Sequence, residues 1–368
     1  MEQTTGTRES AGDVSTPPPM PAPTTTRVGA VVDADPQSQS FKNKVERLRG
    51  DRDLLSIAPM MEVTDRYYRT FMRNVTRHTK LYTEMVVDDT ILHQMDNLDR
   101  FVGFDAVQHP VAIQLGGDNA EKLGKCSEVC EKWGYDEINL NCGCPSKRVV
   151  SKCFGAKLML DPDKVREIAS TMRRHAGNCP VTIKCRLGAD ERDSYEELCE
   201  FVKTASLSGV THFIVHARKC LLDGLSTKQN RTIPELKYHW VFQLCRDFPD
   251  LEFSLNGHVE TMAEAQALLR PIPSRIACDQ QLLAEYLKRA TAHTQKLGVG
   301  KRDTALTHEL DDDSAVDAEH HRSTFLSTST GAVAFGELAD TDNDSNQLLT
   351  LNSVMIGYDC CNCRVTLC

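Results

Sequence analysis

Residues 137–146 read EINLNCGCPS, a short strand-like run followed at once by polar and reactive side chains. The run itself is 137–140, after which Asn141 leads into a loop where Gly143 and Pro145 flank Cys144. Parallel sheets place their binding sites at the carboxyl ends of the strands, where these residues fall. Six other β-branched or apolar runs have the same form, at 54–58, 81–86, 111–115, 181–185, 213–216 and 252–255.

Helical segments lie between these runs and carry good start signals. Asp161 supplies a cap before Pro162 in the first turn of one of them,. Thr261 and Glu264 form a capping box at the start of another,. Repeated strand–helix units imply parallel strands joined by right-handed crossovers. A closed barrel and an open doubly wound sheet both satisfy this alternation.

The residues at the ends of the runs distinguish the two architectures. They are Pro59, Met60, Glu84, Gln114, Asn141, Lys184, His216 and Asn256. In a (β/α)8 barrel all strand ends meet at one mouth, whereas an open sheet uses only the strands at its switch point. Nearly every run ends in a residue whose side chain can take part in binding or catalysis. We therefore predict an α/β fold, a TIM (β/α)8-type barrel.

An eighth strand is not recognisable in the sequence. Two prolines interrupt residues 270–276, and residues 282–297 have a helical pattern. Composition therefore predicts four parts: a disordered N-terminal extension (1–40), a barrel (41–280), a partial helical segment (281–300) and an acidic, disordered tail (301–368),.

The formal net charge of −9 is unevenly distributed over the 368 residues. Residues 1–40 carry −3 and residues 301–368 carry −8, so the remainder is slightly basic, at +2. An RNA partner is therefore compatible with the charge of the barrel.

The sequence also bears on the cellular compartment. It has no long apolar stretch, so we expect no membrane span, and we recognise no secretory signal. The fifteen cysteines are an odd number in a long chain, and Cys126 and Cys130 have the helical spacing of core residues. We expect a reducing compartment, the cytoplasm, with an organelle left open.

Cys144 is the strongest candidate for chemistry. A cysteine between glycine and proline directly after a strand is held in a fixed loop at the barrel mouth. The thiol is mostly protonated at neutral pH and could donate a proton, or act as a nucleophile in a suitable environment. A buried structural cysteine is the alternative. Cys142 could pair with it on a metal, but no second pair at zinc spacing lies nearby, so we predict no metal site.

Several short motifs occur together in a fixed order. They are APM (58–60), YTEM (82–85), AIQLG (112–116), NLNCGCPS (139–146), KCR (184–186), HAR (216–218), GLS (224–226), NR (230–231) and NG (256–257). Together they resemble the tRNA-dihydrouridine synthases, closest to the A-type subfamily, over about residues 53–270.

This resemblance implies a barrel that binds FMN, takes electrons from NADPH and reduces the C5–C6 double bond of a uridine in the D-loop of tRNA. It implies that Cys144 donates the proton to C5. The implied cofactor contacts are Pro59, Met60 and Met61 beneath the flavin, Gln114, Lys184 and His216 on its ring, and Asn256 and Gly257 at its phosphate. The implied tRNA contacts are Asn141, Lys228 and Arg231, and the helical segment 281–300 resembles a remnant of the family's C-terminal helical tRNA-binding domain.

Elementary chemistry is consistent with these roles, and each has a plainer alternative. Hydride addition builds negative charge on the uracil ring, which a nearby cation such as Lys184 stabilises. Lys184 could instead form a salt bridge with Glu84, and His216 could be a satisfied core histidine. Lys228 and Arg231 could belong to a solvated surface, or neutralise phosphates.

The sequence departs from the family at the phosphate end. His258 stands where a second glycine is usual, and the Gly-Arg pair after the eighth strand has no match. We therefore expect two unpaired strand edges, weak FMN binding and marginal stability.

A shortened sequence and a divergent protein that lost activity both stay open as explanations. An inactive barrel that binds RNA or protein, and a flavin oxidoreductase acting on a small molecule, are the alternative functions. The target uridine and the oligomeric state are also open.

Overall fold

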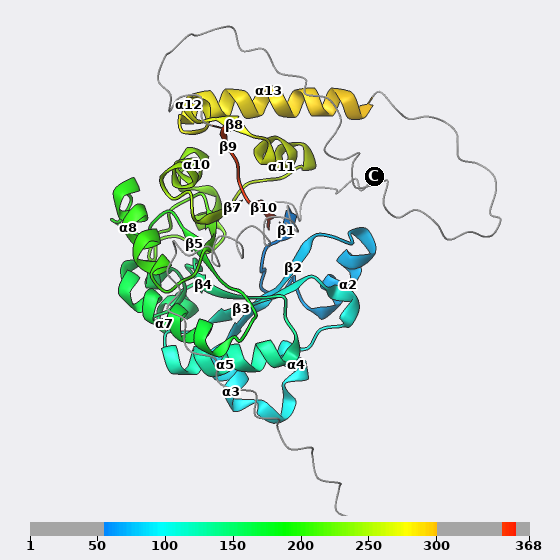
Figure 1. The fold of residues 1–368 in the computed structure, drawn as a ribbon, viewed down its shortest axis with the longest axis vertical. Coiled ribbons are helices and arrows are strands. Elements are labelled where there is room, and N and C mark those ends of the chain that lie inside the picture. The colour runs from blue at the N-terminus through cyan, green and yellow to red at the C-terminus, as the bar shows by residue number, and fades with distance from the viewer. Residues whose placement is uncertain (1–54, 300–347, 358–368) are drawn as a thin grey trace, which may run out of the picture. The chain divides into compact units, whose positions relative to one another are not determined.

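Eight parallel strands close into a barrel in the computed structural model, which describes residues 55–299 and 348–357 (Figure 1). Seven strands lie at the predicted runs: β1 (Leu55–Ile57), β2 (Lys80–Val87), β3 (Val111–Gly116), β4 (Glu137–Cys142), β5 (Val181–Arg186), β6 (His212–His216) and β7 (Glu252–Asn256). Each strand from β2 to β7 pairs in parallel with the strand before it. The predicted α/β barrel is therefore confirmed.

The eighth position of the barrel is taken by β10 (Ser353–Ile356), which comes from the tail. It pairs in parallel with β1 on one side and β7 on the other. Successive side chains of a strand point to opposite faces. Val354 and Met355 are both buried, so β10 is covered by other residues on both faces. The expectation of two unpaired edges is wrong, and so is the prediction of a disordered tail for 348–357. Residues 1–54, 300–347 and 358–368 lie outside the described residues, so the predicted extension (1–40) and the start of the predicted barrel (41–54) are not described.

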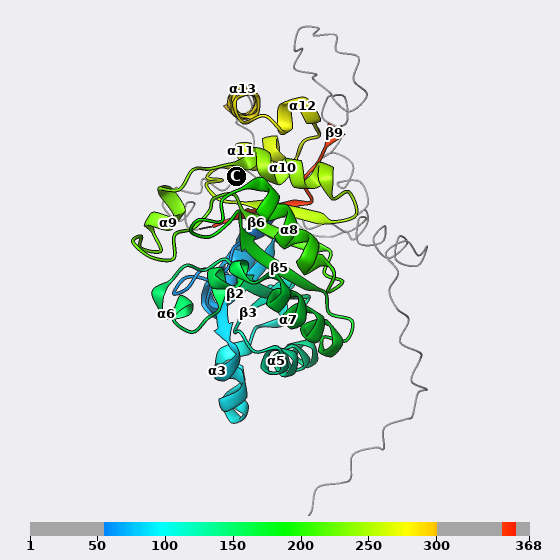
Figure 2. The same cartoon turned by 90° about the vertical axis from the view of Figure 1, so that its left-hand side faces the viewer.

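The helices cover the outside of the barrel (Figures 1 and 2). The longer ones are α2 (Arg66–Val75), α5 (Ala120–Trp133), α7 (Pro162–His175), α8 (Tyr195–Ser206), α10 (Tyr238–Asp247), α11 (Met262–Leu269) and α13 (Gln280–Val299). The shorter ones are α3 (Asp88–His93), α4 (Asp99–Val102), α6 (Lys147–Val150), α9 (Gln229–Thr232) and α12 (Ser274–Ala277). Single 3-10 turns lie at Met95–Asn97, Ala106–Gln108 and Gly155–Leu160.

The predicted helix starts are present. The Asp161 side chain accepts a hydrogen bond from the backbone N–H of Lys164, with Pro162 in the first turn. Thr261 and Glu264 form both bonds of the capping box. Such caps satisfy backbone donors that a helix leaves free at its start.

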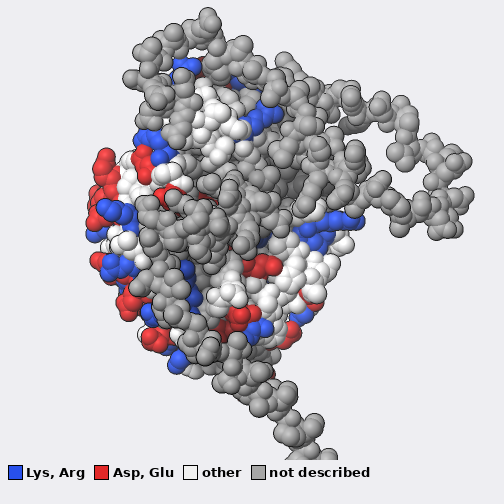
Figure 3. Space-filling view, viewed as in Figure 1, with Lys and Arg blue, Asp and Glu red and all other residues white. Residues whose placement is uncertain are grey.

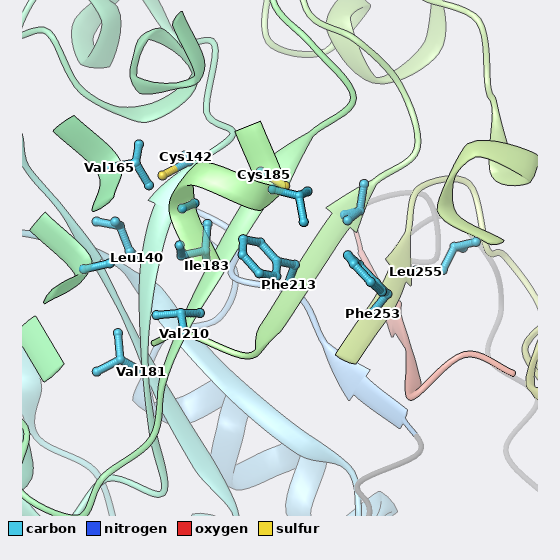
Figure 4. Packing of buried hydrophobic residues seen from close by; sticks show 14 of the residues in the cluster. Leu140, Cys142, Val165, Val181, Ile183, Cys185, Val210, Phe213, Phe253 and Leu255 are labelled. Atoms are coloured by element: carbon cyan, nitrogen blue, oxygen red, sulfur yellow. The ribbon is translucent and has the colours of Figure 1, made fainter. Parts of the chain in front are cut away.

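Two apolar layers form the core. Outward-facing strand residues such as Leu140, Ile183 and Phe213 pack under the surrounding helices, with Cys142 and Cys185 among them (Figure 4). Cys126 and Cys130 are buried in the same layer, as predicted. The second cluster contains inward-facing residues, among them Tyr82, Ala112, Ile214 and Met355. Because Met355 belongs to β10, the eighth strand takes part in filling the barrel.

The C-terminal helices pack beside the last strands. α13 spans the predicted helical pattern and contacts α11 and α12 (Figure 1). The short strands β8 (Ile272–Pro273) and β9 (Leu348–Leu349) pair antiparallel. β9 comes shortly before β10 in the sequence. Among the described helices, none has the length and apolar character that crossing a membrane requires.

Candidate functional site

A cavity of about 1060 Å³ lies at the carboxyl ends of the barrel strands. Ten of the residues singled out from the sequence line it: Pro59, Met61, Gln114, Asn141, Cys144, Lys184, His216, Arg231, Asn256 and Gly257. The other two are Met60, which is almost fully buried, and Lys228, which is exposed beside Arg231 on α9. The barrel therefore brings residues distant in the sequence to one cavity.

Cys144 is held at this cavity by its neighbours in the loop. Asn141 Oδ1 accepts hydrogen bonds from the backbone N–H groups of Gly143, at 3.1 Å, and Cys144, at 3.0 Å. The Cys144 carbonyl accepts from the backbone N–H of Ala156 at 3.0 Å. Cys142 is instead buried in the outer core. The two cysteines of the CxC pair thus lie in different environments, and only Cys144 lines the cavity.

Lys184 projects from β5 and contacts β7. Its Nζ donates to Asn256 Oδ1 at 3.0 Å. Burial, and next the nearby Arg186 charge, lower the pKa of Lys184 to about 8, so the ammonium form predominates at neutral pH. Glu84, the partner in the alternative salt bridge, accepts from the backbone N–H of Glu62. Lys184 is therefore a half-buried cation held by a neutral amide.

His216 ends β6 with its ring in the cavity wall. Within the described part of the chain, its buried Nε2 has no hydrogen-bond partner. Burial, and then the charges of Arg186 and Lys184, lower the pKa of His216 well below its usual value. The ring is therefore neutral. A buried ring nitrogen without a partner is costly unless a ligand satisfies it, which argues against the satisfied core histidine.

Glycines shape the side of the cavity near β7 and β10. Gly257 has a φ of +114°, and a Cβ there would lie 3.0 Å from His216 Cδ2. His258 follows with a φ of +51°, a left-handed conformation that a residue with a Cβ rarely adopts. Gly357, directly after β10, lies beside Ala58 and Asn256. The structure thus brings a second glycine to this region from a segment that the sequence reasoning missed.

These features fit a flavin nucleotide. Lys184 offers a cation and His216 Nε2 an unsatisfied polar atom. Gly257 and Gly357 line the cavity and allow close approach of a ligand to the backbone,. Apolar residues such as Ala58, Pro59 and Met61 also line the cavity. Apolar walls with a few convergent polar groups are typical of cofactor sites.

Arg186 is a site residue to which the sequence reasoning gave no role. Its buried guanidinium donates to the carbonyl oxygens of Gly143 at 3.0 Å, Lys219 at 3.1 Å and Asn230 at 2.8 Å. It therefore ties the Cys144 loop to the loops after β6. The KCR motif was the available signal, but the three acceptors are backbone atoms, which no sequence pattern reveals.

Basic side chains occur at the rim of the cavity. Arg100, Arg148, Lys152 and Arg231 are among its lining residues. The helical side, at the left of Figure 3, instead carries interspersed acidic and basic side chains. Acidic side chains also line the cavity, among them Glu62, Asp65, Asp89 and Asp99. The charge at its edge is therefore mixed, and the basic residues offer local contacts for an anionic ligand.

Comparisons with known proteins agree with this site. The family model described as "Dihydrouridine synthase (Dus)" matches residues 56–275. A tRNA-dihydrouridine(20/20a) synthase from Synechocystis sp. is 50% identical over 247 residues, 66% of this chain and 73% of that protein. Proteins of the same name from Shewanella oneidensis and Escherichia coli K12 are 44% and 47% identical, over 62% and 58% of this chain and 68% and 61% of their own lengths. The predicted resemblance to A-type synthases is confirmed. The chain belongs to the dihydrouridine synthase family.

Proposed function

We propose that the chain is an FMN-dependent tRNA-dihydrouridine synthase, an oxidoreductase that uses NADPH to reduce the C5–C6 double bond of a D-loop uridine. The observation that supports this most directly is that three groups share one cavity: the Cys144 thiol, the Lys184 ammonium and the His216 Nε2, which has no hydrogen-bond partner among the described residues. The names of the similar bacterial proteins, tRNA-dihydrouridine(20/20a) synthases, indicate the same reaction.

The residues divide between cofactor and substrate. Pro59, Met60 and Met61 would support the flavin ring, with Gln114, Lys184 and His216 as its polar contacts. Asn256 and Gly257 would face its phosphate. Bound FMN would supply hydride chemistry. The expectation of weak FMN binding rested on His258, on the unmatched Gly-Arg pair and on the missing eighth strand. β10 supplies that strand and brings Gly357 to the cavity, while His258 stays in place.

Cys144 holds the proton that the reduced uridine needs. The reaction adds a hydride at C6 and a proton at C5, and the thiol supplies the proton as a general acid. Its loop is held by Asn141 and Arg186, so the thiol has a defined position at the cavity. The Lys184 ammonium stabilises the negative charge that develops on the base.

Binding of tRNA would use the basic rim. Lys228 and Arg231 would contact phosphates, and Asn141 would contact the uridine. The uridine must leave its stack to reach a cavity inside a barrel mouth. All eleven cysteines that the structure describes are free thiols, which fits the reducing compartment, the cytoplasm, in which we propose the protein works.

The decisive experiment is to incubate the purified 368-residue chain with NADPH and unmodified tRNA and to measure dihydrouridine by mass spectrometry. We expect a yellow protein with about one FMN per chain and dihydrouridine in the D-loop. Bound tRNA without dihydrouridine would support an inactive RNA-binding barrel. Turnover of a free pyrimidine but not of tRNA would support a small-molecule oxidoreductase. Either result would overturn the proposal.

A further inference from the structure

An unbroken chain of side-chain hydrogen bonds runs inside the barrel from the start of β4 to the Cys144 loop. Thr182 Oγ1 donates to Glu137 Oε1 at 2.6 Å, and Asn139 Nδ2 donates to Thr182 Oγ1 at 2.8 Å. Gln114 Nε2 then donates to Asn139 Oδ1 at 2.8 Å, and Asn141 Nδ2 donates to Gln114 Oε1 at 2.7 Å. Asn141 Oδ1 accepts from the loop backbone, as described above.

Every bond in this chain points the same way, toward Glu137. An ionised carboxylate can only accept, so Thr182 must donate its single proton to it. The Thr182 oxygen can then only accept from Asn139. Each later amide is oriented in turn, because its oxygen faces the donor of the next residue.

Glu137 is well suited to fix this direction. It is almost fully buried, and Lys80 Nζ contacts it at 2.9 Å while the Tyr82 hydroxyl donates to it. Burial alone would raise the pKa of this carboxyl, but Lys80, His212 and the two hydroxyl donors lower it to about 2. The carboxylate is therefore ionised throughout the physiological pH range.

We propose that Glu137, acting through Thr182 and Asn139, is a positioning residue that sets the orientation of the Gln114 and Asn141 amides and so holds the Cys144 loop. The role in turnover rests on the proposed function, since Gln114 and Asn141 are its cofactor and substrate contacts. The role in loop order rests on the hydrogen bonds alone.

The orientation matters most at Asn141. If its amide were reversed, Nδ2 would face the backbone N–H groups of Gly143 and Cys144, donor against donor. Both loop bonds would be lost, and Gln114 would need to reverse as well. A residue at the far end of the barrel therefore governs which polar atoms of Gln114 and Asn141 remain for a ligand.

The test is Thr182→Val, which removes the hydroxyl at nearly constant shape. Thr171→Val on α7 is the matched control, because both threonines are 3% exposed and Thr171 Oγ1 accepts a hydrogen bond from Arg174, which takes no part in the series from Glu137 to Asn141. Two readouts are compared: the single-turnover rate of uridine reduction at saturating tRNA, and the rate at which iodoacetamide alkylates Cys144, followed by peptide mass spectrometry.

We expect Thr182→Val to slow uridine reduction about tenfold and to speed alkylation of Cys144 by a similar factor, the usual scale of one lost hydrogen bond. Thr182→Ser, which keeps the hydroxyl, should restore both rates. Thr171→Val should lower the melting temperature comparably and leave both rates at the wild-type value.

Wild-type rates in Thr182→Val would overturn the inference. If that variant does not fold, Glu137→Gln replaces it, because a glutamine can donate and so no longer dictates the direction; unchanged rates there would have the same meaning. A wild-type protein that makes no dihydrouridine would refute the proposed function, while the alkylation rates would still decide whether the chain of bonds holds the loop.

Discussion

At the scale of single residues, the environment of Cys144 separates its chemistry from that of the cofactor. The thiol lines the cavity, and the loop is held by hydrogen bonds between its backbone and the side chains of Asn141 and Arg186, which do not involve the sulfur atom. We expect Cys144→Ala to keep reduction of FMN by NADPH, because that step needs no proton from the thiol. Reduction of uridine should fall about 100-fold or more, the scale for removing a general acid.

Stopped-flow absorbance measures the first step and dihydrouridine content the second. Cys153→Ala is the matched control, since Cys153 is exposed and is not among the cavity-lining residues. A Cys144→Ala enzyme that reduces tRNA at the wild-type rate would refute the assignment.

Lys184 predicts a pH dependence of cofactor affinity. Burial lowers the pKa of Lys184 to about 8, so its positive charge is present below pH 8 and is lost above it. An anionic ligand that binds only the charged form should bind about fivefold more weakly at pH 9 than at pH 8. Fluorescence titration with FMN measures this. Lys184→Met should bind more weakly at pH 7 and lose the decline; an equal decline in that variant would assign the effect to another group.

Residue types at strand ends were predictable, but their partners were not. Six polar positions near strand ends could be read from the sequence, because a strand of fixed direction places the residues at its carboxyl end near the mouth. The bond from Lys184 to Asn256, rather than to Glu84, joins residues 72 apart and depends on the stagger of β5 against β7. The chain from Glu137 to Asn141 likewise depends on register between strands, which a single sequence does not display.

At the scale of elements, β10 completes the barrel, and its contribution to stability and FMN binding can be tested by deletion. It pairs with both β1 and β7 and buries Val354 and Met355. Deleting residues 348–368 should therefore lower the melting temperature by several degrees or more, because it removes Leu349 and Leu351 as well as Val354 and Met355, and each buried apolar side chain is worth about 1.5–3 kcal/mol. Stoichiometric FMN binding should be lost as well.

Deleting only residues 358–368 is the control for this experiment, because it leaves β10 and Gly357 in place. We expect that shorter deletion to keep FMN at about one per chain by absorbance. If the longer deletion also keeps its melting temperature and its FMN, β10 is not needed to close the barrel.

The eighth strand escaped sequence analysis for a physical reason. Its apolar part is only Val354, Met355 and Ile356, and it follows a long polar, acidic segment instead of a crossover helix. Parallel strands are expected after such a helix, and the last helical pattern of the sequence ends near residue 297, so no strand is predicted beyond it. The combination of a short apolar run with Gly357 directly behind it was the available signal.

At the scale of the whole molecule, charge predicts how substrate binding responds to salt. The net charge of −9 conceals a slightly basic part between residues 41 and 300, and basic side chains occur at the cavity rim. We expect tRNA affinity to fall steeply as salt is raised, since binding releases counterions. Lys228→Ala should reduce the slope of log affinity against log salt by about one.

Lys203 on α8 supplies the comparison, because it is exposed like Lys228 but lies outside the α9 segment that carries the cavity-lining residue Arg231. Lys203→Ala should leave the slope unchanged in the same filter-binding or anisotropy assay. Equal slopes for the two variants would show that Lys228 lies outside the tRNA contact.

The origin of β10 has a consequence for synthesis on the ribosome. Ser353 of β10 lies against Ser254 of β7, yet the two are 99 positions apart in the chain. At about 5–20 residues per second, β7 would emerge some 5–20 s before its neighbour. During that interval β1 and β7 would present free edges, to which other nascent chains can add. The yield of folded protein should therefore depend on chaperones that shield the unfinished sheet during this interval. Chaperone level should affect the yield more than translation rate does.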